Sequence, residues 1–132
     1  MIPKFRAWNK EGNRMILPKY LYSIDLLKEQ VTERTKCNYT FSLHSIPFDD
    51  IELMQSTGLK DKNGKEVFEK DILDYNGRKV IVKWHGSYAC FIYEFVDEMK
   101  NRTTEWQPLY LSYYKFEIIG NSLENPELLE VE

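Results

Sequence analysis

The stretch GLKDKNGKEVFEKDI combines glycines, acids and an amide, the residue types that bind calcium in loops. An EF-hand loop needs oxygen ligands at positions one, three, five and twelve around a glycine at position six. With Gly64 at position six, Asp61 and Asn63 fit positions three and five. Leu59 and Lys70 then occupy positions one and twelve, so two required oxygen ligands are absent. The spacing excludes an EF-hand.

The same stretch also fails the test for a phosphate-binding loop. The P-loop pattern has four residues between its glycines and a Ser or Thr after the lysine. Here five residues separate Gly58 from Gly64, and Glu66 follows Lys65. We therefore predict a tight turn at Asn63-Gly64 and no phosphate site.

Cysteines and histidines are too few and too scattered to predict a metal centre. The chain has Cys37, Cys90, His44 and His85, without the paired ligand spacing of a zinc site. Cys90 lies among apolar residues, which is typical of a small core side chain. We predict no metal, no cofactor and no catalytic residues. An enzyme built on Cys90 and a histidine is the least favoured alternative.

Basic and aromatic residues alternate in RKVIVKWHGSYACFIY, as they do where small barrels bind single-stranded nucleic acid. The candidate binding residues are Arg78, Lys79, Lys83, Trp84 and Tyr88. However, Gln55–Trp84 carries seven Lys or Arg against five Asp or Glu, a small excess for that role.

Composition indicates one domain of mainly β structure over residues 1–132. Hydrophobic residues make up 42% and aromatic residues 14% of the chain, and aromatic side chains favour strands. The net charge of −3 gives no overall basic surface. The first residues lack the apolar segment of a signal peptide, and no apolar run is long enough for a membrane span. We expect a cytoplasmic protein with reduced thiols.

Turn residues and apolar spacing predict the elements. We expect a hairpin over residues 3–16, a helix over Ser23–Lys36 and a strand over Tyr39–His44. Asn76-Gly77 and His85-Gly86 mark the two turns of a three-stranded antiparallel meander. One or two strands follow within residues 109–120, and Pro126 begins a helical turn.

These elements predict a small SH3-like antiparallel barrel over residues 55–120. Residues 1–54 form the N-terminal hairpin and a variable segment beside it. Residues 121–132 form an acidic C-terminal tail, and the fold contains at most one short helix.

Three blocks of the sequence resemble the YopX-like family of phage and prophage proteins. They are IPKFRAWNKEGNRM, LMQSTGLKDKNGKEVFEKDI and FEIIGNSLENPELL, in the order of the family and spanning nearly the whole chain. Lys70-Asp71 stands where the family usually has Gly-Asp, and Leu17–Ser45 matches no block. The resemblance implies a mainly β fold and a phage or prophage origin. It implies no established activity.

The middle block specifies more residue types than a turn requires, so the resemblance implies that these residues have structural roles. They are Gln55, Thr57, Gly58, Leu59, Asp61, Asn63 and Gly64. Gly58 is expected to hold a positive φ, and Asp61 to cap the turn through its side chain.

The favoured function is a non-enzymatic protein-interaction module that self-associates and binds a host or phage protein. The aromatic excess supports it, because Tyr and Trp are enriched at interfaces. The alternative is an accessory protein that binds single-stranded nucleic acid through the basic and aromatic face.

Overall fold

The computed structural model describes residues 2–97 and 106–130. Its chain forms two compact units, Met1–Gln55 and Ser56–Glu132. The predicted single domain over residues 1–132 stays a prediction.

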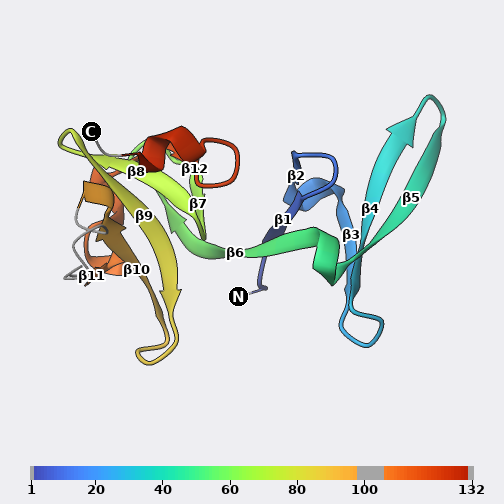
Figure 1. Cartoon of the computed structure of the whole chain (residues 1–132), viewed down its shortest axis with the longest axis horizontal. Coiled ribbons are helices and arrows are strands. Elements are labelled where there is room, and N and C mark those ends of the chain that lie inside the picture. Colours follow the sequence, from blue (N-terminus) through green and yellow to red (C-terminus); the bar gives the residue numbers. More distant parts are fainter. Residues whose placement is uncertain (1, 98–105, 131–132) are drawn as a thin grey trace. The chain divides into compact units, whose positions relative to one another are not determined.

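Figure 1 shows the strands along the chain. The first unit contains β1 (Phe5–Asn9), β2 (Arg14–Ile16), β3 (Leu21–Asp25), β4 (Gln30–Cys37) and β5 (Thr40–Pro47). Strand β6 (Ile51–Lys60) belongs to both units. The second unit adds β7 (Glu66–Phe68), β8 (Asp71–Tyr75), β9 (Arg78–His85), β10 (Cys90–Phe95), β11 (Trp106–Pro108) and β12 (Glu117–Asn121).

Helical structure among the described residues consists of 3-10 turns of three or four residues. Those whose bounds are described are η1 (Pro18–Tyr20), η2 (Phe48–Asp50), η4 (Leu109–Leu111), η5 (Tyr113–Lys115) and η6 (Pro126–Leu129), and Val96 and Asp97 also have 3-10 conformation. The expected mainly β fold is therefore confirmed, as is the turn that begins at Pro126. None of the helices in the described part of the chain is long and apolar enough to cross a membrane.

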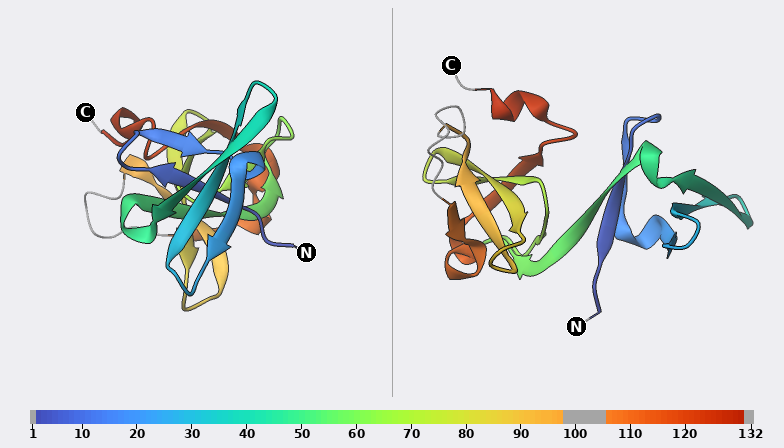
Figure 2. Two further views of the ribbon diagram at one scale, coloured as in Figure 1. Left: turned by 90° about the vertical axis from the view of Figure 1, so that its right-hand side faces the viewer. Right: turned by 60° about the horizontal axis from the view of Figure 1, so that its bottom comes forward.

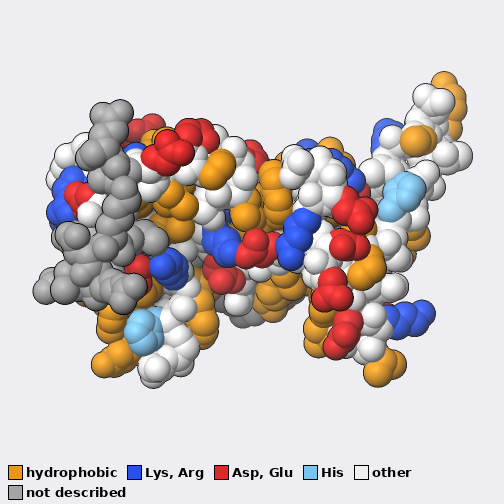
Figure 3. Space-filling view, viewed as in Figure 1, with side chains coloured by type: hydrophobic (Ala, Val, Ile, Leu, Met, Phe, Trp, Pro, Cys, Tyr) orange, Lys and Arg blue, Asp and Glu red, His pale blue; other side chains and the backbone are white. Residues whose placement is uncertain are grey.

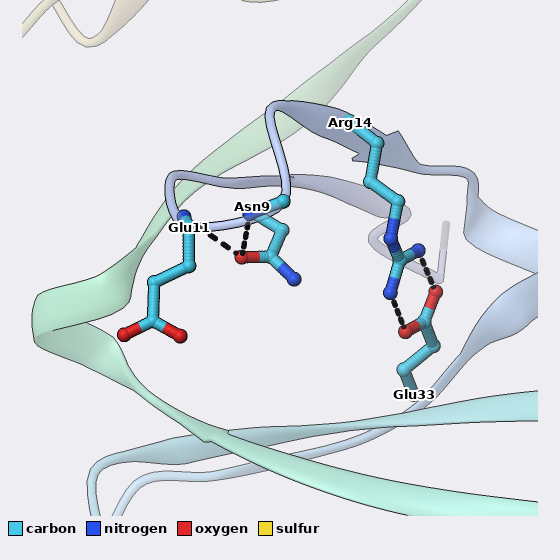
Figure 4. Close-up of polar contacts among 5 residues, drawn as sticks. Asn9, Glu11, Arg14 and Glu33 are labelled. Atoms are coloured by element: carbon cyan, nitrogen blue, oxygen red, sulfur yellow. Dashed lines mark hydrogen bonds and ion pairs between the residues drawn. The ribbon is translucent and has the colours of Figure 1, made fainter.

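The first unit begins with the predicted N-terminal hairpin. β1 pairs with β2 on one side and with Ile51–Gln55 of β6 on the other. The side chain of Asn9 shapes the turn, since its oxygen accepts hydrogen bonds from the backbone N–H groups of Glu11 and Gly12 (Figure 4). Asn13 closes the turn with a φ of 49°, a conformation that Asn tolerates. The buried side chains at the centre of this unit are Ala7, Ile16, Val31 and Ile51.

The predicted helix over Ser23–Lys36 is wrong. The segment forms β3 and β4, which are joined by a turn and continue into a three-stranded sheet with β5. Asp25 makes the turn, because its carboxylate accepts hydrogen bonds from the N–H groups of Leu27 and Lys28 at 3.0 and 2.9 Å. Val31 is buried in alternation with its neighbours along β4. Pairing with β5 outweighs the weak helical spacing of the leucines.

In the second unit, a five-stranded antiparallel sheet has the order β11-β10-β9-β8-β12. The curled strands form a half-barrel, which Figures 1 and 2 show in yellow to red. This half-barrel is the part of the fold that corresponds to the predicted small antiparallel barrel. Its core consists of Val67, Leu73, Val80, Val82, Tyr93, Leu109 and Phe116. Residues 109–120 supply the one strand β12, after two 3-10 turns.

The two turns of the predicted meander differ in length. Asn76 and Gly77 form a two-residue turn with φ values of 51° and 85°, as a type I′ turn requires. After His85, four residues lead to Cys90 rather than the expected two. The positive φ of that loop lies at Ala89, at 50°, and not at the predicted His85-Gly86.

Candidate interaction surfaces

The residues of the middle sequence block lie along β6 and in the turn that leads to β7. The carboxylate of Asp61, 5% exposed, accepts backbone hydrogen bonds from Asn63 and Lys65, both at 2.9 Å. Its second oxygen accepts the N–H of Ile118 at 3.0 Å, and this bond joins the turn to β12. Gly64 completes the turn with a φ of 82°. The polar groups of this turn are therefore engaged within the fold.

The register between β6 and β7 shifts between Ser56 and Lys60, and the block residues hold this irregular stretch. Gly58 has a φ of 76°, which a residue with a Cβ rarely adopts. The hydroxyl of Thr57 donates to the carbonyl of Val67 at 2.7 Å and accepts the N–H of Leu59 at 3.1 Å. At the end of the first unit, Gln55 pairs with β1.

Strand alternation divides the five residues predicted to form a basic and aromatic face. Arg78 and Trp84 lie on the side of β9 that carries the core valines. Lys79 and Lys83 lie on the opposite side of the same strand. Tyr88 stands in the loop between β9 and β10. The structure therefore does not bring these five residues to one surface.

Two of the three predicted cations already have anionic partners. The guanidinium of Arg78 pairs with Asp97 at 2.8 Å and lies over the ring of Phe95 at 3.8 Å from its centre. The ammonium of Lys83 lies 2.9 Å from the carboxylate of Glu94 on the neighbouring strand. These contacts occupy the charge that a phosphate backbone would need.

The third predicted cation, Lys79, also lies near carboxylates. Arg78 and Lys79 line a cavity of about 470 Å³, and Asp97, Glu127 and Glu130 line the same cavity. Three acidic side chains beside two basic ones make this hollow unfavourable for a phosphate group.

An aromatic cluster that sequence reasoning missed lies at the end of β9. The rings of His85, Tyr88 and Trp106 lie mutually 4.8 to 4.9 Å apart between centres. Trp106 is distant in sequence, so its place depends on the pairing of β11 with β10.

Cys90 is the cross-strand partner of His85, yet no hydrogen bond joins them among the described contacts. It begins β10 and is partly exposed, whereas the sequence suggests a core position. Within residues 2–97 and 106–130, no three His, Cys, Asp or Glu side chains are grouped to hold a metal ion.

The hairpin of β4 and β5 exposes several apolar side chains of the first unit. β3 pairs with β4 only as far as Glu33, so the outer half of the hairpin has two strands and no third. There Tyr39 is fully exposed, and Phe41 and Leu43 are 56% and 53% exposed. Figure 3 shows hydrophobic side chains at the closed end of this hairpin. The alternation of Tyr39–His44 predicts the strand but not that its apolar side faces water.

Arg34 covers part of this apolar surface. Its guanidinium lies 3.6 Å from the centre of the Phe41 ring, and Leu43 is its cross-strand partner on β5. Phe41, Leu43 and Arg34 thus share one face of the hairpin. An aromatic ring, an aliphatic side chain and an arginine are residue types that contribute strongly to protein interfaces.

Comparison with known proteins identifies relatives over nearly the whole chain. A family model described as YopX protein matches residues 4–130. Among solved structures, a crystal structure of protein EF1440 from Enterococcus faecalis is similar, with a TM-score of 0.62 and 30% sequence identity. The match covers 98% of this chain and 99% of that protein. No curated protein matches the chain.

Proposed function

Because this chain belongs to the YopX family, we propose that it is a phage or prophage accessory protein that works as a non-enzymatic protein-interaction module in the host cytoplasm. Its interaction surface is the outer half of the β4–β5 hairpin, Arg34–Leu43. The partner is a protein, of the phage, of the host or a second copy of this chain.

The exposed apolar side chains of the hairpin carry this proposal. Removing apolar surface from water contributes about 25 cal/mol per Å². The exposed apolar surface of Phe41 and Leu43 is not buried within their own unit, so its burial by a partner would contribute to binding. Single exposed apolar residues are common, but a group of them on one projecting element marks an interaction site.

The outer hairpin contributes little to the core of its own unit. The core residues of β4 and β5 and their neighbours, such as Val31 and Ile46, lie in the other half of the hairpin. The outer half instead has exposed or half-exposed residues on both faces. A strand pair with this much exposed apolar surface is stabilised when a partner covers it.

Binding of single-stranded nucleic acid is the second candidate, and the ring cluster of His85, Tyr88 and Trp106 favours it. Stacked bases bind to such rings. Against it stand the ion pairs of Arg78 and Lys83. If this candidate were correct, oligonucleotide affinity would fall steeply with salt, and changing Lys79 and Lys83 to Glu would abolish it. We expect no measurable binding at near-physiological salt.

A photoreactive phenylalanine analogue at Phe41 tests the proposed interaction surface. In host cells that express the full chain, irradiation should join position 41 to one or a few defined proteins. The matched control places the same analogue at Leu27, which is 94% exposed on the β3–β4 turn of the same unit. Equal or absent adducts at both positions would contradict the proposed surface.

A further inference from the structure

Strand β5 differs from the other edge strands in length and regularity. It forms one edge of the sheet β3-β4-β5 and pairs with β4 over eight residues without a register shift. Among the described edge strands, β2, β7 and β11 have three residues each. β3 and β12 have five residues each, and both contain an irregularity in their register. Short or bulged edges resist pairing with another chain, whereas β5 has neither protection.

The sequence of β5 also lacks the side chains that usually protect an edge. TFSLHSIP contains no Lys, Arg, Asp or Glu, and its proline is the last residue of the strand. A lysine or an internal proline on an edge strand prevents the addition of a further strand. The opposite edge of the same sheet carries Asp25 in addition to its bulge.

We propose that β5 pairs antiparallel with β5 of a second copy of this chain, so that two three-stranded sheets become one continuous sheet across a two-fold axis. This inference rests on the proposed function and names the partner of the same hairpin. Main-chain hydrogen bonds would join the two strands, as in other complexes that form by strand addition. A two-fold contact of this kind is closed and gives a dimer rather than a fibre.

The distribution of charge favours a second copy as the occupant. Because β5 carries no Lys, Arg, Asp or Glu, pairing it with itself places none of these charged side chains opposite another. Arg34 and Lys36 lie on β4, one strand behind the edge. The two β4 strands of the dimer would be about 14 Å apart, at a strand spacing of about 4.8 Å. The guanidinium of Arg34 lies over the Phe41 ring on β5 and is therefore closer to the second copy than its own strand is, but it is exposed, so water and salt weaken its repulsion there.

The apolar side chains select a register centred on Ser42. In that register Phe41 of each copy lies directly opposite Leu43 of the other, and Thr40 lies opposite His44. Phe41 and Leu43 are two residues apart and therefore share one face. A register centred on Leu43 or His44 would instead place Phe41 opposite Ser45 or Pro47. A cross-strand contact between the Phe41 ring and Leu43 stabilises the pair more than a contact of Phe41 with serine or proline does.

Light scattering of the full chain after size exclusion, over a range of concentrations, tests the proposal. The wild type should be a dimer in equilibrium with monomer. Phe41→Lys and Leu43→Lys should each raise the dissociation constant about tenfold or more, because they place charge in the pairing edge. Leu27→Lys, at a more exposed apolar position outside β5, should leave the dimer unchanged. Circular dichroism verifies that each variant is folded.

Mixed variants test the register. Phe41→Lys of one chain should lie opposite Leu43→Glu of the other, so a mixture of these two variants should dimerise more tightly than either variant does alone. A wild type that is monomeric throughout, or a dimer that Phe41→Lys and Leu43→Lys leave intact, would overturn the self-pairing. In the first case, adducts of position 41 with a different protein would still support the proposed function. Only the absence of any adduct specific to position 41 would contradict both the self-pairing of β5 and the proposed function.

Discussion

The guanidinium of Arg14 forms two parallel hydrogen bonds with the carboxylate of Glu33 (Figure 4). This ion pair joins β2 to β4 within the first unit. The two side chains differ in environment, since that of Glu33 is 4% exposed and that of Arg14 is 48% exposed. The hydrogen bonds from Arg14 lower the pKa of Glu33, although burial of the carboxyl group acts in the opposite direction.

Arg14→Met should destabilise the protein more than Glu33→Gln does. The first change leaves a buried carboxylate without its counter-ion, and we expect a loss of about 2–3 kcal/mol. The second leaves an arginine that reaches water, and we expect a loss of about 1 kcal/mol. Urea unfolding of both variants measures the difference. Equal losses in the free energy of unfolding would mean that the burial of Glu33 does not determine how much each substitution destabilises the protein.

The contribution of this pair should depend on pH in a defined direction. A carboxyl group whose pKa is lowered by folding stabilises the native state above its unfolded pKa of about 4.3. As the pH falls through the lowered pKa, Glu33 is protonated and the contribution is lost. In Arg14→Met, protonation neutralises the unpaired carboxylate of Glu33 and removes the cost of burying its charge. The gap in unfolding free energy between wild type and variant should therefore narrow from pH 7 to pH 3, and a widening gap would contradict the assignment.

Gly77→Ala should cost about 1 kcal/mol of stability, and Gly86→Ala should cost much less. An added Cβ would meet no atom within 4 Å at either position. Only Gly77 has a positive φ, 85°, so the comparison isolates the backbone conformation from crowding. Thermal or urea unfolding of the two variants provides the test. A similar loss at both glycines would show that the type I′ turn is not the cause.

Asp61→Ala should destabilise the second unit by about 2–4 kcal/mol. The change removes a buried carboxylate that accepts three backbone hydrogen bonds, one of them from β12. Lys62→Ala is the control in the same turn, because its ion pair with Glu117 is exposed at 3.7 Å and contributes little. Hydrogen exchange at the N–H of Ile118 should become faster in the Asp61 variant alone.

Local signals predicted local structure well. Asn76-Gly77 indicates a type I′ hairpin because both residues tolerate positive φ, and no distant contact is needed to fix it. The segment from Ser23 to Lys36 has no such signal. Its leucines suggest helical spacing, but Leu26 and Leu27 lie in an exposed turn. What makes Val31 part of a strand is its pairing with Ile46, a contact that no window of β4 alone contains.

The candidate surfaces also depend on contacts between strands that the local sequence does not contain. Alternation along β9 alone places Lys83 and Trp84 on opposite faces. The carboxylate of Glu94 as the partner of Lys83 depends on the register between β9 and β10. The outer half of the hairpin has no third strand because β3 begins at Leu21, opposite Glu33 of β4. Both facts are properties of strand pairing rather than of residue type.

Lys70→Gly should stabilise the protein although it removes a side chain. Lys70 has a φ of 69°, a conformation that glycine adopts more readily than a residue with a Cβ. Two backbone hydrogen bonds hold this conformation, from its own N–H to the carbonyl of Val82 and from the N–H of Ser122 to its carbonyl. A left-handed conformation costs a residue with a Cβ about 1–2 kcal/mol, and the added freedom of glycine in the unfolded chain offsets part of this.

Lys70→Ala is the reference that separates the backbone from the side chain. It loses the lysine side chain but keeps the Cβ, so any contact of that side chain is removed in both variants. We expect Lys70→Gly to exceed Lys70→Ala by about 0.5–1 kcal/mol in the free energy of unfolding. The midpoint of urea unfolding, at constant slope, gives this difference. If the alanine variant proved the more stable, the positive φ would not be the strained feature of this position.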